Sequence, residues 1–373
     1  MQKVIVSVIN DLVTDQRVNK VCNTISEQGF LVLLVGRKLK TSLPMDKRTY
    51  ATHRMKLLFT KGFLFYAEYN IRLFFFLLFQ KADVYHANDL DTLLPNFLVC
   101  KFKRKELVYD SHEYFCFVPE LVNRKMVQKT WLKIEQWIFP KLKYVFTVNE
   151  SIAQAYEKHY GIKPVVLRNV PSLKNFENIP FRSRSQLSLP ENKAIILLQG
   201  AGININRGAE EALQAMLYIE DALLLIIGGG DVIDKLKGIT AKFNLQEKVV
   251  FKNKMPFTEL IQHTRCADVG ITLDKADNPN YELSLPNKLF DYIHSQIPVL
   301  SSPLIEIKKI YSRYNVGELI DNHNPEHIAD KLRFMIQNEQ MQLVWRQNTL
   351  LASREYNWEN ESIKLKEIYN KFK

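Results

Sequence analysis

Short apolar runs alternate with amphipathic segments along most of the chain, and this alternation limits the possible folds more than any other feature. In the first half, strands are predicted at residues 3–9, 30–37, 82–89, 106–113 and 144–151, with a helix at 15–29. Continuous apolar strands separated by helices are typical of a parallel sheet that is covered on both faces. The sequence therefore predicts an α/β fold.

A polar segment interrupts this alternation and divides the chain into two series. Residues 168–193 contain three prolines and show no helical period, so we expect a linker there. A second series of apolar runs follows at residues 194–202, 222–230, 248–254, 267–273, 297–302 and 316–321. We predict two Rossmann-like, doubly wound domains that face each other across a central cleft.

The predicted boundaries follow from the polar break. We place the N-terminal domain at residues 1–170, the linker at 171–190, the C-terminal domain at 191–355 and a terminal helix at 356–373. Asn357 is suited to cap that helix. Its apolar residues have a helical period, which leaves open whether the helix packs on its own domain or crosses back to the first.

Composition supports two folded domains in a reducing compartment. The 373 residues exceed one ordinary core, and 46% hydrophobic with 24% charged residues is typical of a globular chain. The four cysteines are far apart and form no CxxC, which disfavours disulfides or a zinc site. The start reads as a strand rather than a signal peptide, and the longest apolar stretch, 73–79, is too short for a membrane span. We expect a cytoplasmic protein, soluble or peripheral.

The net charge of +11 favours an acidic partner, either phosphorylated ligands or an anionic membrane. Nucleic acid is the least favoured, because the cations are spread along the chain without a recognition motif. Two basic aromatic segments, 61–81 and 123–143, are predicted as crossover helices on the sheet. In the second, we expect Val127, Trp131, Ile134 and Ile138 on one face; the lysines beside its tryptophans also suit an anionic membrane surface.

Polar residues end two strands of the first domain. Residues 86–89 and 110–113 lie at the carboxyl ends, where ligands bind in such sheets. We interpret His86 as a structural strand-end residue. Asp89 and Asp91 form a DxD pattern, which occurs in some metal sites, but so short a pattern is common by chance. We therefore expect no metal site, although Asp89 remains a candidate to line the cleft.

In the second domain, two helix starts carry cations. A glycine-bearing turn at 201–208 precedes a helix and includes Arg207, an arrangement that favours an anion. Lys288 and Asp291 are three residues apart at the start of another helix, beside a predicted strand end. They could form a solvated ion pair or bind a phosphate and a ribose diol. The glycines at 228–230 do not have the spacing of a dinucleotide fingerprint.

The order of these motifs resembles the donor-binding half of the retaining family 4 glycosyltransferases with the GT-B fold. The resemblance is carried by G-x-x-x-x-R-G at 202–208, GGG at 228–230, ADVGITL at 267–273 and LPNKLFDY with IPVLSS at 285–302. Residues 86–115 are similar to the acceptor-binding half of the same family. The resemblance covers most of the chain.

This resemblance implies transfer of a sugar from a UDP- or GDP-linked donor to a glycan, lipid-phosphate or other cell-envelope acceptor. It implies retention of configuration, and no metal or other cofactor. Arg207 and Lys288 resemble the residues that bind the diphosphate, and His112 the histidine that faces the reacting sugar. Asp291 matches the second acid of the family's Glu-x7-Glu motif, which contacts the ribose. Gly202 and Gly229 complete the expected donor site.

The sequence also departs from the family pattern. The first acid of Glu-x7-Glu falls on Leu283, and Glu282 is one residue out of register, so Glu282 is kept as a donor-binding candidate. The usual basic residue of the first loop falls on Ala201 or Gly202.

The glycine-rich loop of the first domain is replaced by residues 10–20. Asp15, Arg17, Asp89 and Glu113 are therefore the candidates on the acceptor side. Two other functions stay open: a nucleotide-sugar epimerase of the same fold, and a degenerate transferase that acts as a binding partner.

Overall fold

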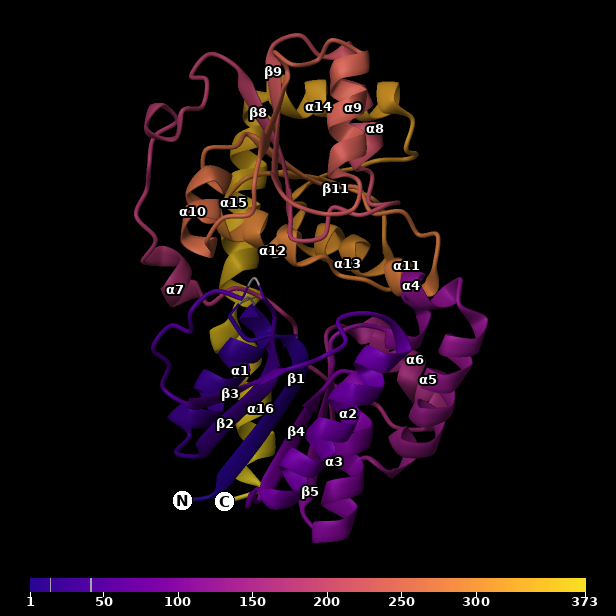
Figure 1. Cartoon of the computed structure of the whole chain (residues 1–373). Helices are drawn as coiled ribbons and strands as arrows, with labels where there is room; N and C mark the ends of the chain where they lie inside the picture. Colours follow the sequence, from indigo (N-terminus) through magenta and orange to yellow (C-terminus); the bar gives the residue numbers. More distant parts are fainter. Residues whose placement is uncertain (14, 41) are drawn as a thin grey trace. The chain divides into compact units, whose positions relative to one another are not determined.

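The computed structural model describes residues 1–13, 15–40 and 42–373. The chain divides into two compact units, coloured along the sequence in Figure 1. The first unit comprises Met1–Asn169, Asn278–Asn280 and Glu361–Lys373, and the second comprises Val170–Asp277 and Tyr281–Asn360. The terminal helix therefore belongs to the first unit for most of its length.

The first unit contains a parallel sheet with the strand order β3-β2-β1-β4-β5-β6-β7. Its strands are β1 Lys3–Asp11, β2 Leu31–Lys38, β3 Ala51–Lys56, β4 Val84–Asn88, β5 Glu106–Ser111, β6 Tyr144–Thr147 and β7 Val165–Val166. Strand β1 lies between β2 and β4, with Val4 opposite both Val32 and Val84. The strand order reverses at β1, which is the switch point where ligands bind in such sheets.

Helices cover both faces of this sheet (Figure 1). They are α1 Gln16–Glu27, α2 Gly62–Phe79, α3 Leu90–Lys103, α4 Pro119–Val122, α5 Lys125–Ile138, α6 Glu150–Tyr160 and α16 Trp358–Asn370, with 3-10 turns η1 Phe115–Phe117 and η2 Phe139–Lys141. Successive residues of a strand point to opposite faces. Accordingly, Tyr85 packs in the core beneath α2 and α3, whereas His86 bonds to Tyr369 of α16.

The second unit repeats the arrangement with the order β10-β9-β8-β11-β12-β13. Its strands are β8 Ala194–Gly200, β9 Ala222–Gly228, β10 Val249–Lys252, β11 Val269–Thr272, β12 Val299–Ser301 and β13 Gly317–Leu319. Its helices are α7 Leu173–Glu177, α8 Ala209–Ala215, α9 Ile233–Lys242, α10 Phe257–Thr264, α12 Asn287–His294, α13 Ile305–Tyr314, α14 Pro325–Gln337 and α15 Glu339–Glu355, with η3 Ser185–Leu187 and η4 Met216–Tyr218; α11 Pro279–Glu282 lies at the boundary of the units.

Two parallel sheets with interleaved helices confirm the predicted fold class. The segment 171–190, predicted as a linker, instead contains α7 and η3 and packs on the second unit. Leu187 and Leu189 are buried against Ile195 there. The reason is that its few apolar side chains suffice to anchor an otherwise polar segment.

The face predicted for helix α5 also differs. Trp131 and Ile138 are buried as expected, but Val127 is exposed and Glu135 is buried in its place. The Glu135 carboxylate accepts hydrogen bonds from Tyr156 and Tyr160. Burial of this acid is tolerated because its oxygens have partners, which an apolar periodicity does not reveal.

Candidate active site

In the second unit, the loops that leave β8 and β11 meet at the switch point of the sheet. The Arg207 Nη1 atom, from the loop after β8, lies 3.5 Å from the Asp274 Oδ1 atom, which follows β11. The Lys288 Nζ atom, in the first turn of α12, lies 3.7 Å from Asp274 Oδ2. Two cations from different parts of the sequence therefore converge on one carboxylate.

The Asp274 carboxylate is only 1% exposed, and the Lys288 side chain is 10% exposed. Thr272 donates a further hydrogen bond to Asp274 Oδ2. Burial lowers the pKa of Lys288, and the carboxylate of Asp274 opposes that shift. A buried anion between two cations holds them in place, and phosphate oxygens of a ligand could take over the same contacts.

The conformation of Arg207 is restrained from a second side. Its guanidinium lies 4.8 Å from the centre of the Tyr281 ring, in a cation–π contact. The next residue, Gly208, has a φ of +71°, and a Cβ atom there would lie 2.4 Å from Leu273 O. Only glycine allows this approach of the two loops, which brings Arg207 beside Asp274.

Asp291 lies one turn after Lys288 on α12. Its Oδ2 atom accepts a hydrogen bond from Gln199 Nε2 at 2.9 Å, and Gln199 Oε1 accepts one from Thr264. The sequence left open a solvated ion pair between Lys288 and Asp291. In the structure, the salt bridge of Lys288 is to Asp274. Both residues lie on α12, between β11 and β12, as the order of the apolar runs predicts.

The remaining candidates for donor binding are Glu282, Gly202 and Gly229. Glu282 is exposed on the short helix α11, and Leu283 is half-buried. Gly202 lies exposed in the loop after β8, whereas Gly229 lies beside the Lys254 side chain. The neighbouring Gly230 has a packing role, since a Cβ atom there would lie 2.0 Å from Ile203 O.

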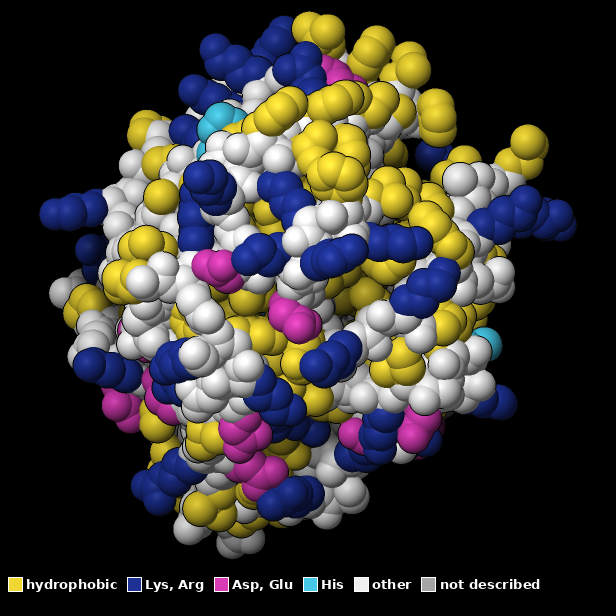
Figure 2. Space-filling model, turned by 90° about the horizontal axis from the view of Figure 1, so that it is seen from below, with side chains coloured by type: hydrophobic (Ala, Val, Ile, Leu, Met, Phe, Trp, Pro, Cys, Tyr) yellow, Lys and Arg dark blue, Asp and Glu magenta, His cyan; other side chains and the backbone are white. Residues whose placement is uncertain are grey.

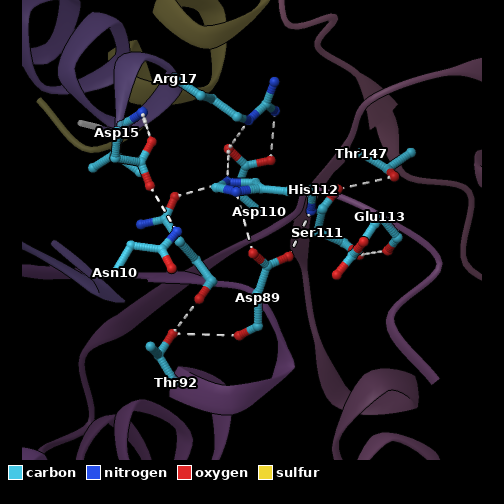
Figure 3. Close-up of polar contacts among 12 residues, drawn as sticks. Asn10, Asp15, Arg17, Asp89, Thr92, Asp110, Ser111, His112, Glu113 and Thr147 are labelled. Carbon is cyan, nitrogen blue, oxygen red and sulfur yellow. Dashed lines mark hydrogen bonds and ion pairs between the residues drawn. The ribbon is translucent and has the colours of Figure 1, made fainter. Parts of the chain in front are cut away.

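In the first unit, His112 lies between two carboxylates at the ends of β4 and β5 (Figure 3). Its Nδ1 atom is 3.2 Å from Asp89 Oδ2, and its Nε2 atom is 3.4 Å from Asp110 Oδ2. The His112 backbone N–H also donates to Asp89 Oδ1 at 2.8 Å. Asp89 adopts a φ of +59°, a strained conformation for a residue with a Cβ.

These contacts set the charge of His112. Burial disfavours the imidazolium, but the carboxylates of Asp89 and Asp110 outweigh burial and raise the pKa of His112 to about 10. For Asp110, burial is likewise outweighed, by Arg17 and then by His112, so its pKa is well below the ordinary value. At neutral pH, His112 is therefore a cation and cannot act as a base.

Arg17 and Asp15, the predicted acceptor-side residues, have structural contacts. The Arg17 guanidinium is buried and binds Asp110 through two hydrogen bonds of 3.0 and 2.7 Å, with a third to Leu167 O. Asp15 caps α1 by accepting a hydrogen bond from Val18 N. Figure 3 shows Arg17 directed at Asp110, so we assign Arg17 to holding that carboxylate.

Glu113 and the DxD residues complete the polar edge of the first sheet. Ser111 Oγ donates to the Glu113 carbonyl oxygen. Asp91 is buried in the first turn of α3, where burial and then the charge of Asp89 raise its pKa. Residues 1–13, 15–40 and 42–373 include no cluster of three His, Cys, Asp or Glu side chains that could hold a metal ion.

Two family descriptions match the chain, one for each half. Residues 16–171 match Glycosyltransferase Family 4, and residues 181–351 match Glycosyl transferases group 1. The chain belongs to the group 1 glycosyltransferases of the family 4 type. This group 1 glycosyltransferase is also 20% identical, over 199 residues, to D-inositol 3-phosphate glycosyltransferase of Corynebacterium glutamicum (strain R). That match covers 51% of the chain and 46% of the relative, so the chain spans about half the length of the curated relative.

Solved structures share the fold of this group 1 glycosyltransferase. Sucrose-phosphate synthase from Thermosynechococcus elongatus has a TM-score of 0.80 at 16% identity, covering 100% of this chain and 99% of that one. A glycosyltransferase from Rickettsia africae has a TM-score of 0.74 at 15% identity, with 100% and 98% covered. Anabaena HepE, solved with UDP-glucose, has a TM-score of 0.75 at 12% identity, with both chains fully covered. The predicted GT-B architecture is thereby confirmed.

Sequence reasoning missed three residues that contact Arg207, Lys288 or Asp291, namely Asp274, Gln199 and Tyr281. Asp274 could have been found, because it is the first charged residue after the apolar run of β11. Gln199 and Tyr281 carry no such signal. Their contacts to Asp291 and Arg207 depend on which loops the fold brings together.

Proposed function

We propose that the chain transfers a sugar from a nucleotide-diphospho-sugar to a glycan, a lipid-linked saccharide or another cell-envelope acceptor, with retention of the anomeric configuration. The observation that carries this proposal is the convergence of Arg207 and Lys288 on the buried Asp274 at the switch point of the second sheet. Such an edge is where ligands bind in Rossmann-like folds.

The two cations have the chemistry that the reaction needs. Breaking the bond between the sugar and the diphosphate leaves negative charge on the departing nucleotide. Arg207 offers a planar fork of donors and Lys288 a compact ammonium group, both suited to phosphate oxygens. In a site sheltered from water, each such contact lowers the barrier by about 3 kcal/mol.

The roles of the other residues are proposed from the family resemblance. Asp291, oriented by Gln199, is the proposed acceptor of hydrogen bonds from the ribose hydroxyls. His112 is the proposed contact for the reacting sugar, and its positive charge would suit an oxygen that gains negative charge. Because Anabaena HepE was solved with UDP-glucose, we propose UDP sugars as the first donors to test and GDP sugars as the second.

We also propose that no metal or further cofactor takes part, since the charges of Arg207 and Lys288 supply the neutralisation that a divalent cation would otherwise provide. The net charge of +11 and the free, buried cysteines support work in a reducing cytoplasm at the inner face of the membrane.

A panel of UDP, GDP and other nucleotide sugars tests the reaction class. We expect slow hydrolysis of one donor without an acceptor, unchanged by a chelator, and NMR of the product should show the anomeric configuration of the donor. Loss of activity with the chelator would contradict the metal-free proposal, and an inverted product would contradict retention.

Alanine variants test the site itself. R207A and K288A should each weaken nucleoside diphosphate binding by about tenfold or more, because each removes a charged hydrogen bond. K308A, which alters an exposed lysine on α13, serves as the matched control. Unchanged affinity in R207A and K288A would overturn the assigned site.

The same measurements separate the alternatives. Leu283 at the position of the first family acid favours a degenerate transferase as the second candidate. That candidate predicts a thermal shift with nucleoside diphosphate but no donor hydrolysis. An epimerase predicts conversion of the donor into its epimer. The absence of a thermal shift with every nucleoside diphosphate would contradict both the transferase and the epimerase.

A further inference from the structure

Helix α2 of the first unit presents an apolar face to the outside. Its inner residues, Phe65, Tyr69, Leu73 and Leu77, are buried on the sheet. Its outer residues remain accessible: Phe63 is 77%, Ile71 is 58% and Phe79 is 80% exposed, with Leu64 and Phe75 about half exposed between them. Since both faces of this helix are apolar, the outer face is suited to contact something other than water.

The accessible apolar surface continues onto the neighbouring helices α3 and α5. Phe102 is largely exposed on α3, which packs beside α2. On α5, the half-exposed Trp137 touches Phe97 of α3 with ring centres 5.5 Å apart. Lys141 lies over the Trp137 ring at 5.0 Å. We call these outer residues of α2, α3 and α5 the apolar face.

Exposed cations outnumber exposed acids on the helices that carry the apolar face. Basic residues are exposed on all three helices and at their ends, namely Lys61, Lys81, Lys101, Arg104, Lys125, Lys129 and Lys133. The acid of α2, Glu68, is held by Arg72 and by the backbone N–H groups of Leu58 and Phe59. Figure 2, seen from below, shows hydrophobic and basic side chains mixed across the upper part of the view, where acidic side chains are few.

Helix α2 has the length and composition of a membrane span, with 18 residues and a mean hydropathy of 1.3. Its inner face, however, is part of the core of the first unit. A helix that keeps one face on its own sheet can enter a bilayer only with the other. This geometry is that of a helix lying in the plane of the membrane interface.

We propose that the apolar face docks the first unit on an anionic lipid bilayer. Aromatic and aliphatic side chains of α2 and α3 enter the interface, and the surrounding lysines and arginines bind acidic headgroups. Charge complementarity selects this occupant over a second copy of the chain, whose matching face would place like charges against each other. The proposal does not depend on the transfer reaction, because lipid binding requires no nucleotide sugar.

Sedimentation with vesicles tests the docking. The full chain should bind vesicles of phosphatidylcholine mixed with phosphatidylglycerol, and bind vesicles of phosphatidylcholine alone at least about tenfold more weakly. The double variant I71E/F75E, which places acids on the outer face, should lose about tenfold or more in affinity for the mixed vesicles. The control L343E adds an acid at a 70% exposed leucine on α15 of the second unit and should bind like the wild type.

A fluorescent label gives a second measurement, which reports contact with the bilayer directly and does not depend on a variant that binds more weakly. The four native cysteines are buried, so an environment-sensitive dye can be attached selectively to F79C or L343C. Dye at position 79 should shift its emission to the blue with mixed vesicles, while dye at 343 should not. No sedimentation of the wild type, or equal binding by I71E/F75E, would overturn the proposal. A wild-type dimer in solution that I71E/F75E converts to monomer, without vesicle binding, would instead assign the face to a second copy.

Discussion

At the scale of single residues, charge decides what the two polar edges can do. His112 is held as a cation by Asp89 and Asp110, and Asp110 is itself held by Arg17. In the first unit, one cation lies between two carboxylates. In the second unit, one carboxylate, Asp274, forms salt bridges with two cations. Both arrangements orient a positive group at a strand end, where a phosphate or a developing negative charge can meet it.

The variant D89N tests the charge of His112. The folded pKa of about 10 lies above the unfolded value of about 6.5, so the charged imidazole stabilises the fold fully below pH 6.5 and this contribution is lost as the pH rises toward 10. Between pH 6 and 9.5 the free energy of unfolding of the wild type should fall by about 1–2 kcal/mol more than that of D89N. Urea unfolding at both pH values measures this, with D46N, at an exposed acid, as the control. Equal losses in D89N and the wild type would show that Asp89 does not set the charge.

The variant D274N tests the carboxylate between the cations. Removing its charge leaves Arg207 and Lys288 without their counterion, and we expect a loss of about 1–3 kcal/mol in the free energy of unfolding. Saturating nucleoside diphosphate should restore part of it, because the ligand's phosphates replace the lost anion. Thermal unfolding with and without the ligand measures both effects, and D321N, at an exposed acid, is the control. A deficit that the ligand leaves unchanged would argue against a diphosphate at this position.

At the scale of elements, close packing of two loops places Arg207 beside Asp274. The loop after β8 approaches the end of β11 through Gly208, and this contact sets the distance between Arg207 and Asp274. The short helix α8 begins directly after it. A shift of this turn would move the guanidinium away from the carboxylate without changing either residue.

The variant G208A tests that contact. An added Cβ clashes with the Leu273 backbone and is strained at positive φ, so we expect a loss of more than about 1 kcal/mol in stability and weaker diphosphate binding. Its control is G238A, in the middle of α9, where a Cβ meets no atom within 4 Å. G238A should gain about 0.5–1 kcal/mol because alanine favours helix. Urea unfolding and a binding titration distinguish the two, and a neutral G208A would contradict the packing argument.

At the scale of the whole molecule, the end of the chain completes the first unit. Helix α16 buries Leu365 and Tyr369 in the core of the first unit, although the whole second unit lies between this helix and strand β7 in the sequence. Phe30 and Tyr369 meet with ring centres 5.5 Å apart, and Tyr369 bonds to His86 Nδ1 at 2.7 Å. The first unit is therefore complete only after the second has been synthesised.

The variant Y369F tests this closure. Loss of the hydroxyl leaves the buried His86 ring without its hydrogen bond at Nδ1, and the free energy of unfolding should fall by about 1–2 kcal/mol. The control Y218F removes a hydroxyl from a partly exposed tyrosine of the second unit and should change stability by less than about 0.5 kcal/mol. Urea unfolding followed by circular dichroism compares them. Equal stability of Y369F and the wild type would mean that α16 contributes by apolar packing alone.

Local periodicity was enough to predict both sheets, most strands, the polar residues at strand ends such as His112, and the two helix starts that carry Arg207 and Lys288. Side-chain alternation and helix capping depend on neighbouring residues, so they can be read along the chain. Strand β3 was missed because its residues, Ala51–Lys56, are mostly polar and pair with β2 at the edge of the sheet through backbone hydrogen bonds.

Only the tertiary structure decided which of these residues work together. Arg17 and Asp110 are 93 positions apart, and Asp274 joins loops that meet because β8 and β11 are neighbours. The outer face of α2 stayed accessible because no other element of the described chain covers it, although its composition suits a core helix. Strand order and the covering of faces are properties of the assembled sheet, and no local pattern encodes them.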